Sequence, residues 1–128
     1  MQQPTVYKFC MEHNIPLTAY SNFGRELKYY PNMTVPLNNP TIAAIGKKYN
    51  KTNAQVILRW LIQKRIFAIP KTVTSSRLKE NFDVFDFQLS EEDMNTMASL
   101  NRNDRAWKCE FFLTPGKTIE DVWDHEDI

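Results

Sequence analysis

The sequence lacks the features that mark membrane-spanning, secreted or nucleic-acid-binding proteins. No apolar run approaches the roughly 20 residues that a helix needs to cross a bilayer, and the start, MQQPTVYKFC, contains no signal-peptide core. An excess of one charge is also missing, because Lys+Arg number 16 against Asp+Glu 15 and the net charge is only +1. Such a chain offers no strong field for nucleic acid or an anionic membrane. We therefore expect a soluble, cytoplasmic protein.

Cysteine and histidine are scarce as well. Cys10 and Cys109 stand alone, with no C-x-x-C pair and no neighbouring His, so the sequence indicates neither a zinc site nor a disulfide framework. His13 ends a predicted helix and His125 lies in an acidic tail. We interpret both histidines as surface residues, and we expect no metal site.

The most informative stretch is residues 66–82, IFAIPKTVTSSRLKENF, in a chain of 128 residues that has the length of one domain. The continuous apolar run at 66–69 predicts a parallel strand covered on both faces. That strand ends at Pro70, which can donate no further ladder bond. A helix then follows, with Thr74 as its predicted cap.

Arg77 lies in the first turn of that predicted helix, where the macrodipole disfavours a cation and favours an anion. Free backbone N–H groups, hydroxyls and the cations Lys71 and Arg77, all at the end of a parallel strand, are the parts of a phosphate site. A solvated helix start with ordinary surface charges explains the same residues on composition alone. The residues by themselves leave both interpretations open.

Residues 69–82 resemble the signature near the C-terminus of the aldo-keto reductases. The resemblance implies binding of NADP(H), with a clamp on the 2′-phosphate, a cradle of hydroxyls and main chain around it, and a pair of contacts to adenine. Arginine suits such a ligand because its planar fork bonds two oxygens at once. The resemblance implies that Lys71 and Arg77 form the clamp, that Thr72, Val73 and Thr74 form the cradle, and that Glu80 and Asn81 contact adenine. Thr72 replaces a more usual serine.

A second strand is predicted at residues 15–21, IPLTAYS, from its alternating apolar pattern. Tyr20 and Ser21 lie at its end, where the chain enters a loop. The TAYS element is similar to the seventh barrel strand of the same family, whose tyrosine stacks on the nicotinamide ring. The resemblance therefore adds Tyr20 and Ser21 to the implied cofactor-binding residues. Asn22-Phe23 stands where the family usually has Pro-Leu, so we carry over no further phosphate contact from this loop. On pattern alone, a tyrosine at a strand end is a packing residue.

Helical periodicity and capping signals account for most of the remaining chain. A cap followed by proline, a T-x-x-Q capping box and a Ser with an acidic residue three positions on mark helix starts. In the last helix, Met94, Met97 and Ala98 are expected to face inward as core. The expected helices are 4–13, 40–50, 53–65, 75–82 and 91–100, and a long loop is expected at 25–38.

The order strand, two helices, strand, helix, helix and tail is that of the end of a β/α barrel. We expect an α/β fold in which residues 1–105 form the last two to three units of a (β/α)8 TIM barrel. Residues 106–128 resemble a substrate-loop tail, laid over an apolar surface. A whole barrel takes roughly 250 residues, so this chain cannot close one by itself.

The reaction implied by the resemblance is hydride transfer from NADPH to an aldehyde or ketone, with a catalytic tetrad in the family's N-terminal half. No residue here matches the family's acid, so we assign no catalytic residue. We expect the chain alone to bind NADP(H) weakly or not at all and to reduce no carbonyl compound, with a small carbonyl substrate bound only in a complete barrel.

Three hypotheses are compatible with the sequence. The chain is the C-terminal, cofactor-binding part of an NADP(H)-dependent reductase, or a non-catalytic remnant that acts as a binding or interaction module. If the signature is a coincidence, the chain is an unrelated small α/β domain with an anion site.

Overall fold

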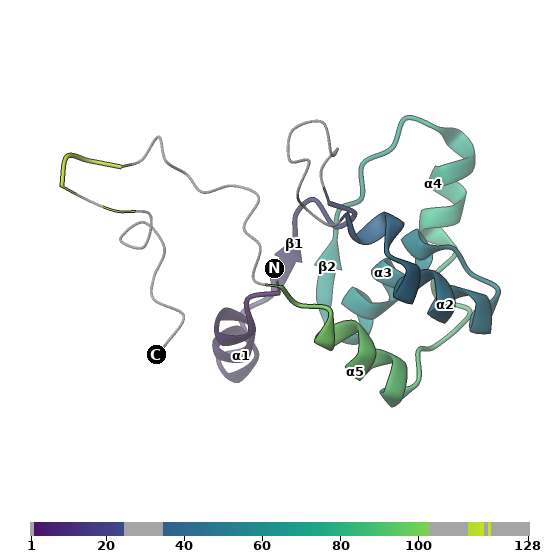
Figure 1. Cartoon of the computed structure of the whole chain (residues 1–128), viewed down its shortest axis with the longest axis horizontal. Coiled ribbons are helices and arrows are strands. Elements are labelled where there is room, and N and C mark those ends of the chain that lie inside the picture. Colours follow the sequence, from purple (N-terminus) through teal and green to yellow (C-terminus); the bar gives the residue numbers. More distant parts are fainter. Residues whose placement is uncertain (1, 25–34, 103–112, 117, 119–128) are drawn as a thin grey trace.

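Two short parallel strands and the helices connected to them form the described chain (Figure 1). The computed structural model describes residues 2–24, 35–102, 113–116 and 118. Strands β1 (Leu17–Ala19) and β2 (Ile66–Ala68) pair in parallel, with Leu17 opposite Ile66 and Ala19 opposite Ala68. The helical elements are α1 (Pro4–Glu12), η1 (Pro36–Asn38), α2 (Pro40–Tyr49), α3 (Asn53–Gln63), α4 (Ser75–Phe82) and α5 (Glu91–Ser99).

Local signals set the ends of α2 and α3 as predicted. Asn39 caps α2 by accepting hydrogen bonds from backbone N–H groups of the first turn, and the helix ends at Asn50, whose φ of 54° is left-handed. Thr52 and Gln55 form the expected capping box of α3. These helix boundaries follow from short-range chemistry that is visible in the sequence.

The starts of α4 and α5 follow the prediction less closely. Thr74 occupies the N-cap position of α4, but its side chain makes no capping hydrogen bond. The preceding turn is closed instead by Thr72, whose Oγ1 accepts from the N–H of Thr74 at 3.2 Å. Ser90 caps α5 as expected, whereas Ala98 is exposed and not part of the core.

The main core lies on one side of the sheet, among α2, α3 and α5. Half of its buried members come from α3, and Ile66 and Ala68 of β2 pack against them. Burial of this many large apolar side chains is the main stabilising term for the fold. The buried members are Ile42, Ile45, Val56, Ile57, Trp60, Leu61, Leu89 and Met97.

The opposite face of β2 is open, so the prediction of a strand covered on both faces is wrong. Phe67 is 65% exposed and Ile69 54%, whereas Ile66 and Ala68 point to the core. Side chains alternate across a strand, and α3 covers only one of the two faces. Within the described ranges, nothing lies over Phe67.

Helix α1 is attached to the C-terminal end of α3 through Tyr7 and Lys64. The Tyr7 hydroxyl donates to the Lys64 carbonyl at 3.2 Å, and the Lys64 ammonium lies 4.0 Å from the centre of the Tyr7 ring. Partial burial lowers the pKa of Lys64. The apolar side chains of α1 are only partly covered, because Phe9 is 53% exposed.

Several expectations concern residues outside the described ranges. They include residues 25–34 of the predicted loop and most of the 106–128 tail, with His125 and Cys109. In the described parts of the chain, no helix is long and apolar enough to span a bilayer. The same parts contain no cluster of potential metal ligands.

Candidate functional site

The C-terminal ends of β1 and β2 bring two of the predicted site segments to one edge of the sheet. Because the strands are parallel and Ala19 lies opposite Ala68, Tyr20 and the loop that leads to Lys71 leave the sheet at the same end. The Tyr20 ring is 82% exposed, so it is not a core packing residue. Ser21 follows with a φ of 55°, which turns the chain sharply away from the strand.

Asn22 connects the loop after β1 to the end of β2. In the amide orientation that satisfies both neighbours, its Nδ2 donates to the carbonyl of Ala19 at 2.7 Å and its Oδ1 accepts from the N–H of Ile69 at 3.2 Å. A proline at this position could make neither bond. The residue that departs from the pattern of the resembled family therefore has a structural role: it holds the Tyr20 loop against residue 69.

Lys71 and Arg77 flank the start of α4, and both are exposed. The described ranges provide no carboxylate partner for either cation. Arg77 is the third residue of α4, where backbone N–H groups are free and the macrodipole favours an anion. Thr72 stiffens the loop between the two cations through its bond to Thr74. This corner of the molecule is cationic and accessible, with donors that suit a phosphate group.

Val73 is the most exposed large apolar side chain of the segment, at 87%. It lies between Thr72 and Thr74, and its side chain takes no part in the core. Its predicted role in the cradle therefore depends on its main chain and stays a prediction.

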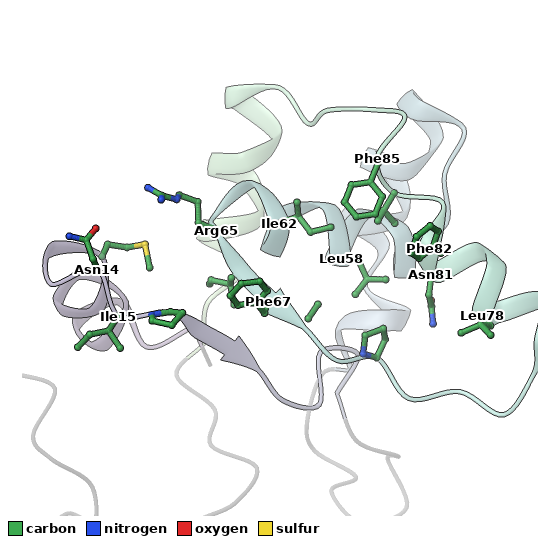
Figure 2. Close-up of a pocket in the computed structure, with 16 residues that line it drawn as sticks. Asn14, Ile15, Leu58, Ile62, Arg65, Phe67, Leu78, Asn81, Phe82 and Phe85 are labelled. Carbon is green, nitrogen blue, oxygen red and sulfur yellow. The ribbon is translucent and has the colours of Figure 1, made fainter.

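Glu80 and Asn81, the predicted adenine pair, lie on different sides of α4. Glu80 faces α3, where Thr52 Oγ1 donates to its Oε1 at 2.7 Å. Asn81 lines an apolar groove together with Leu78 and Phe82 (Figure 2). The structure thus links Glu80 to the first turn of α3, a contact that no sequence pattern indicated.

The groove lies on the open side of β2, bounded by the end of α1, by α3 and by α4 (Figure 2). Its volume is about 840 Å³, and Asn81 is the only predicted site residue along its wall. The groove is therefore distinct from the cationic corner at Lys71 and Arg77. Its apolar lining includes Met11, Ile15, Leu58, Ile62, Phe67, Leu78, Phe82 and Phe85.

A buried carboxylate on α5 forms a second polar cluster that sequence reasoning missed. Asp93 is 2% exposed and accepts hydrogen bonds from the Lys48 ammonium at 2.6 Å, the Tyr49 hydroxyl at 2.7 Å and the Ser90 hydroxyl at 3.0 Å. Desolvation raises the pKa of Asp93, but these hydrogen bonds outweigh it and hold the pKa below its ordinary value. Because Lys48 and Tyr49 join α2 to α5 through Asp93, and Ser90 caps α5, we interpret the cluster as structural.

Comparison with known proteins points to one family. The sequence model described as Aldo/keto reductase family matches residues 1–102. The chain is 46% identical over 105 residues to aldo-keto reductase family 1 member A1-A of Danio rerio, covering 80% of this chain and 32% of that protein. It is 45% identical over 106 residues to aldose reductase B of Dictyostelium discoideum, covering 83% of this chain and 32% of that protein.

Solved structures give the same result. The crystal structure of an aldo-keto reductase (AKR2E5) complexed with NADPH superposes with a TM-score of 0.75 at 39% identity, over 84% of this chain and 34% of that chain. MGS-M4, an aldo-keto reductase from a deep-sea metagenome library, superposes with a TM-score of 0.72 at 40% identity, over 82% and 37%. The chain spans about a third of the length of the curated relatives it matches.

Proposed function

The chain belongs to the aldo/keto reductase family, and from that premise we propose that it is the C-terminal, NADP(H)-binding part of an oxidoreductase that reduces aldehydes or ketones to alcohols. In this proposal, residues 1–105 supply the last units of a (β/α)8 barrel, and residues 106–128 supply a tail on the substrate side. The observation that carries it is the parallel register, which sets the exposed Tyr20 ring and the Lys71 loop at one edge of the sheet. A cytoplasmic location is part of the same proposal, and its support is the family.

The residues of this corner fit an anionic dinucleotide. Lys71 and Arg77 would hold the 2′-phosphate, with Thr72, Val73 and Thr74 around it and the free N–H groups of α4 pointing toward it. The exposed Tyr20 ring, with Ser21 beside it, offers a face for the nicotinamide. Glu80 and Asn81 would meet the adenine, one from each side of α4. NADPH, when bound, supplies the hydride.

The chain by itself would not carry out the reduction. The described residues hold no group matching the family's catalytic acid, and His13 is an exposed residue at the end of α1 that stacks on Phe9. A general acid must reach the oxygen that it protonates. We therefore expect weak cofactor binding and no NADPH-dependent reduction of aldehydes by this chain alone.

Nucleotide binding tests the proposal directly. The isotope-labelled chain is titrated with adenosine 2′,5′-bisphosphate and with adenosine 5′-phosphate, and affinities are read from NMR shift changes. We expect the 2′-phosphate compound to bind more tightly and the Arg77→Ala variant to lose most of that preference, because a charge-assisted hydrogen bond contributes roughly 1.5 to 3 kcal/mol. Lys79→Ala is the matched control, since Lys79 is an exposed cation on the same helix. Equal affinity for the two nucleotides in the unmodified chain would refute the clamp.

A non-catalytic binding module is the second candidate, and the closed core among α2, α3 and α5 favours it. That core is assembled within this chain and is reinforced by the buried Asp93 cluster. The two candidates differ in the coding sequence upstream of residue 1. A continuous upstream frame that encodes the family's catalytic tyrosine, aspartate, lysine and histidine supports the reductase. A transcript that starts at Met1 supports the module.

A further inference from the structure

The first turn of α3 holds Glu80 at both its side chain and its main chain. Thr52 Oγ1 donates to Glu80 Oε1 at 2.7 Å. Gln55, which is 5% exposed, donates from Nε2 to the carbonyl of Glu80 at 3.2 Å and to that of Asp83 at 2.8 Å. The C-terminal turn of α4 is therefore attached to a buried amide on α3.

The hydroxyl of Thr52 serves two purposes that use different atoms. As the N-cap of α3, Oγ1 accepts a hydrogen bond from the N–H of Gln55 at 3.3 Å. Capping needs only this acceptor, and Asp or Asn would provide it as well. The single hydroxyl proton is donated to Glu80 instead. A carboxylate at position 52 could cap the helix but could donate no such proton.

The contact with Thr52 leaves the other carboxylate oxygen of Glu80 available. In the described ranges, Oε2 of Glu80 makes no hydrogen bond. Glu80 follows Arg77 by three residues on α4, which places it about 4.5 Å further along the helix axis and on the same side. A cation and an acceptor about one turn apart on the same side of a helix can contact the 2′-phosphate and the base of one nucleoside. A carboxylate accepts from an exocyclic amine and repels a carbonyl oxygen.

We propose that Thr52 is a positioning residue for base selection: its hydroxyl orients Glu80 so that Oε2 accepts from the 6-amino group of adenine. The inference rests on the proposed function, because it needs a nucleotide with its phosphate at Lys71 and Arg77. It adds to that function a residue on α3 that does not itself touch the ligand.

The test compares two bases that differ at one group. Adenosine 2′,5′-bisphosphate and inosine 2′,5′-bisphosphate, which carries a 6-oxo group, are titrated into the full chain and its variants. Thr52→Val removes the hydroxyl, Thr52→Asp keeps the cap and therefore the fold of α3, and Thr52→Ser keeps both functions. We expect both hydroxyl-lacking variants to lower the adenine-over-hypoxanthine affinity ratio by roughly threefold to tenfold, the size of one hydrogen bond, and Thr52→Ser to restore it.

A second affinity ratio distinguishes a positioning role of Thr52 from a general loss of structure at the site. The preference for adenosine 2′,5′-bisphosphate over adenosine 5′-phosphate reports on Lys71 and Arg77, and we expect it to stay unchanged in every Thr52 variant. An unchanged base ratio in Thr52→Val and Thr52→Asp overturns the role of Thr52 alone. Equal affinity for the two bases in the unmodified chain overturns base selection and leaves the phosphate clamp intact. If the unmodified chain binds none of the nucleotides, the phosphate clamp of this chain and this inference are both overturned.

Discussion

The two sides of α3 differ in how completely the chain covers them. On one side, Ile57 and its neighbours are sealed by α2, α5 and the inner face of β2. On the other side, Leu58 and Ile62 form part of a groove whose rim residues Phe67 and Phe82 are 65% and 76% exposed. Scattered exposed apolar residues are normal, but a continuous apolar groove marks a surface built for contact. Elements of this chain cover the sealed side. The groove side is lined by apolar residues of the kind found in a protein interior, but it is left open.

The largest expected effect contrasts one residue from each side. Ile57→Ala removes a side chain that is 5% exposed and should lower the free energy of unfolding by about 2–5 kcal/mol, through lost burial and the cavity left behind. Phe82→Ala removes a larger side chain from the groove rim and should change it by less than about 0.5 kcal/mol. Urea unfolding followed by circular dichroism measures both. Similar losses in the two variants would mean that the groove is covered in solution.

A smaller effect is expected from the polar cluster on the sealed side. Asp93→Asn keeps the shape but removes the charge that Lys48, Tyr49 and Ser90 bind, and we expect a loss of about 1–3 kcal/mol at neutral pH. Unfolding is measured in the variant and in the unmodified chain across pH.

The direction of the pKa shift of Asp93 determines how its contribution to the free energy of unfolding changes with pH. The pKa of Asp93 in the folded chain lies below its ordinary value of 3.8, so its contribution is complete above that value and is lost as the pH falls through the folded pKa. The difference between Asp93→Asn and the unmodified chain should therefore shrink only below about pH 3.8. A difference that disappears near neutral pH would contradict this account.

The smallest effect concerns the attachment of α1, which borders the groove. Tyr7→Phe removes the hydroxyl that donates to the Lys64 carbonyl and should cost about 0.5–1.5 kcal/mol. Tyr20→Phe is the matched control, because Tyr20 is 82% exposed and lies at the candidate site rather than in the core. Thermal unfolding should rank Tyr7→Phe below Tyr20→Phe. The reverse order would show that α1 is not held to α3 as described.

The sequence predicted the elements well because their signals are local. The caps at Asn39, Thr52 and Ser90 each act within three residues, and the structure has all three. The predicted cap at Thr74 is wrong, because the Thr74 side chain makes no capping hydrogen bond, and the nearby local contact is the one from the N–H of Thr74 to Thr72 Oγ1.

The candidate site could be predicted only in part. Residues 69–82 carry a family signature that is visible in the chain, and the comparisons confirm the family. The individual contacts to NADP(H) stay predictions. The link from Thr52 to Glu80 spans 28 residues, and the contact between Asn22 and Ile69 joins the segments that follow the two strands. No periodicity or capping rule specifies such pairs.

The sequence by itself determined where most helices begin and end, which family the chain resembles and which residues carry charge. The strands predicted at 15–21 and 66–69 are shorter in the structure, at Leu17–Ala19 and Ile66–Ala68. Only the tertiary structure decided which apolar residues are covered and which polar groups meet. The apolar run at 66–69 illustrates the reason: hydrophobicity states what a side chain would gain by burial, but burial needs a second surface. Because α3 covers only one face of β2, Ile66 packs against the core while Phe67 remains exposed beside the groove.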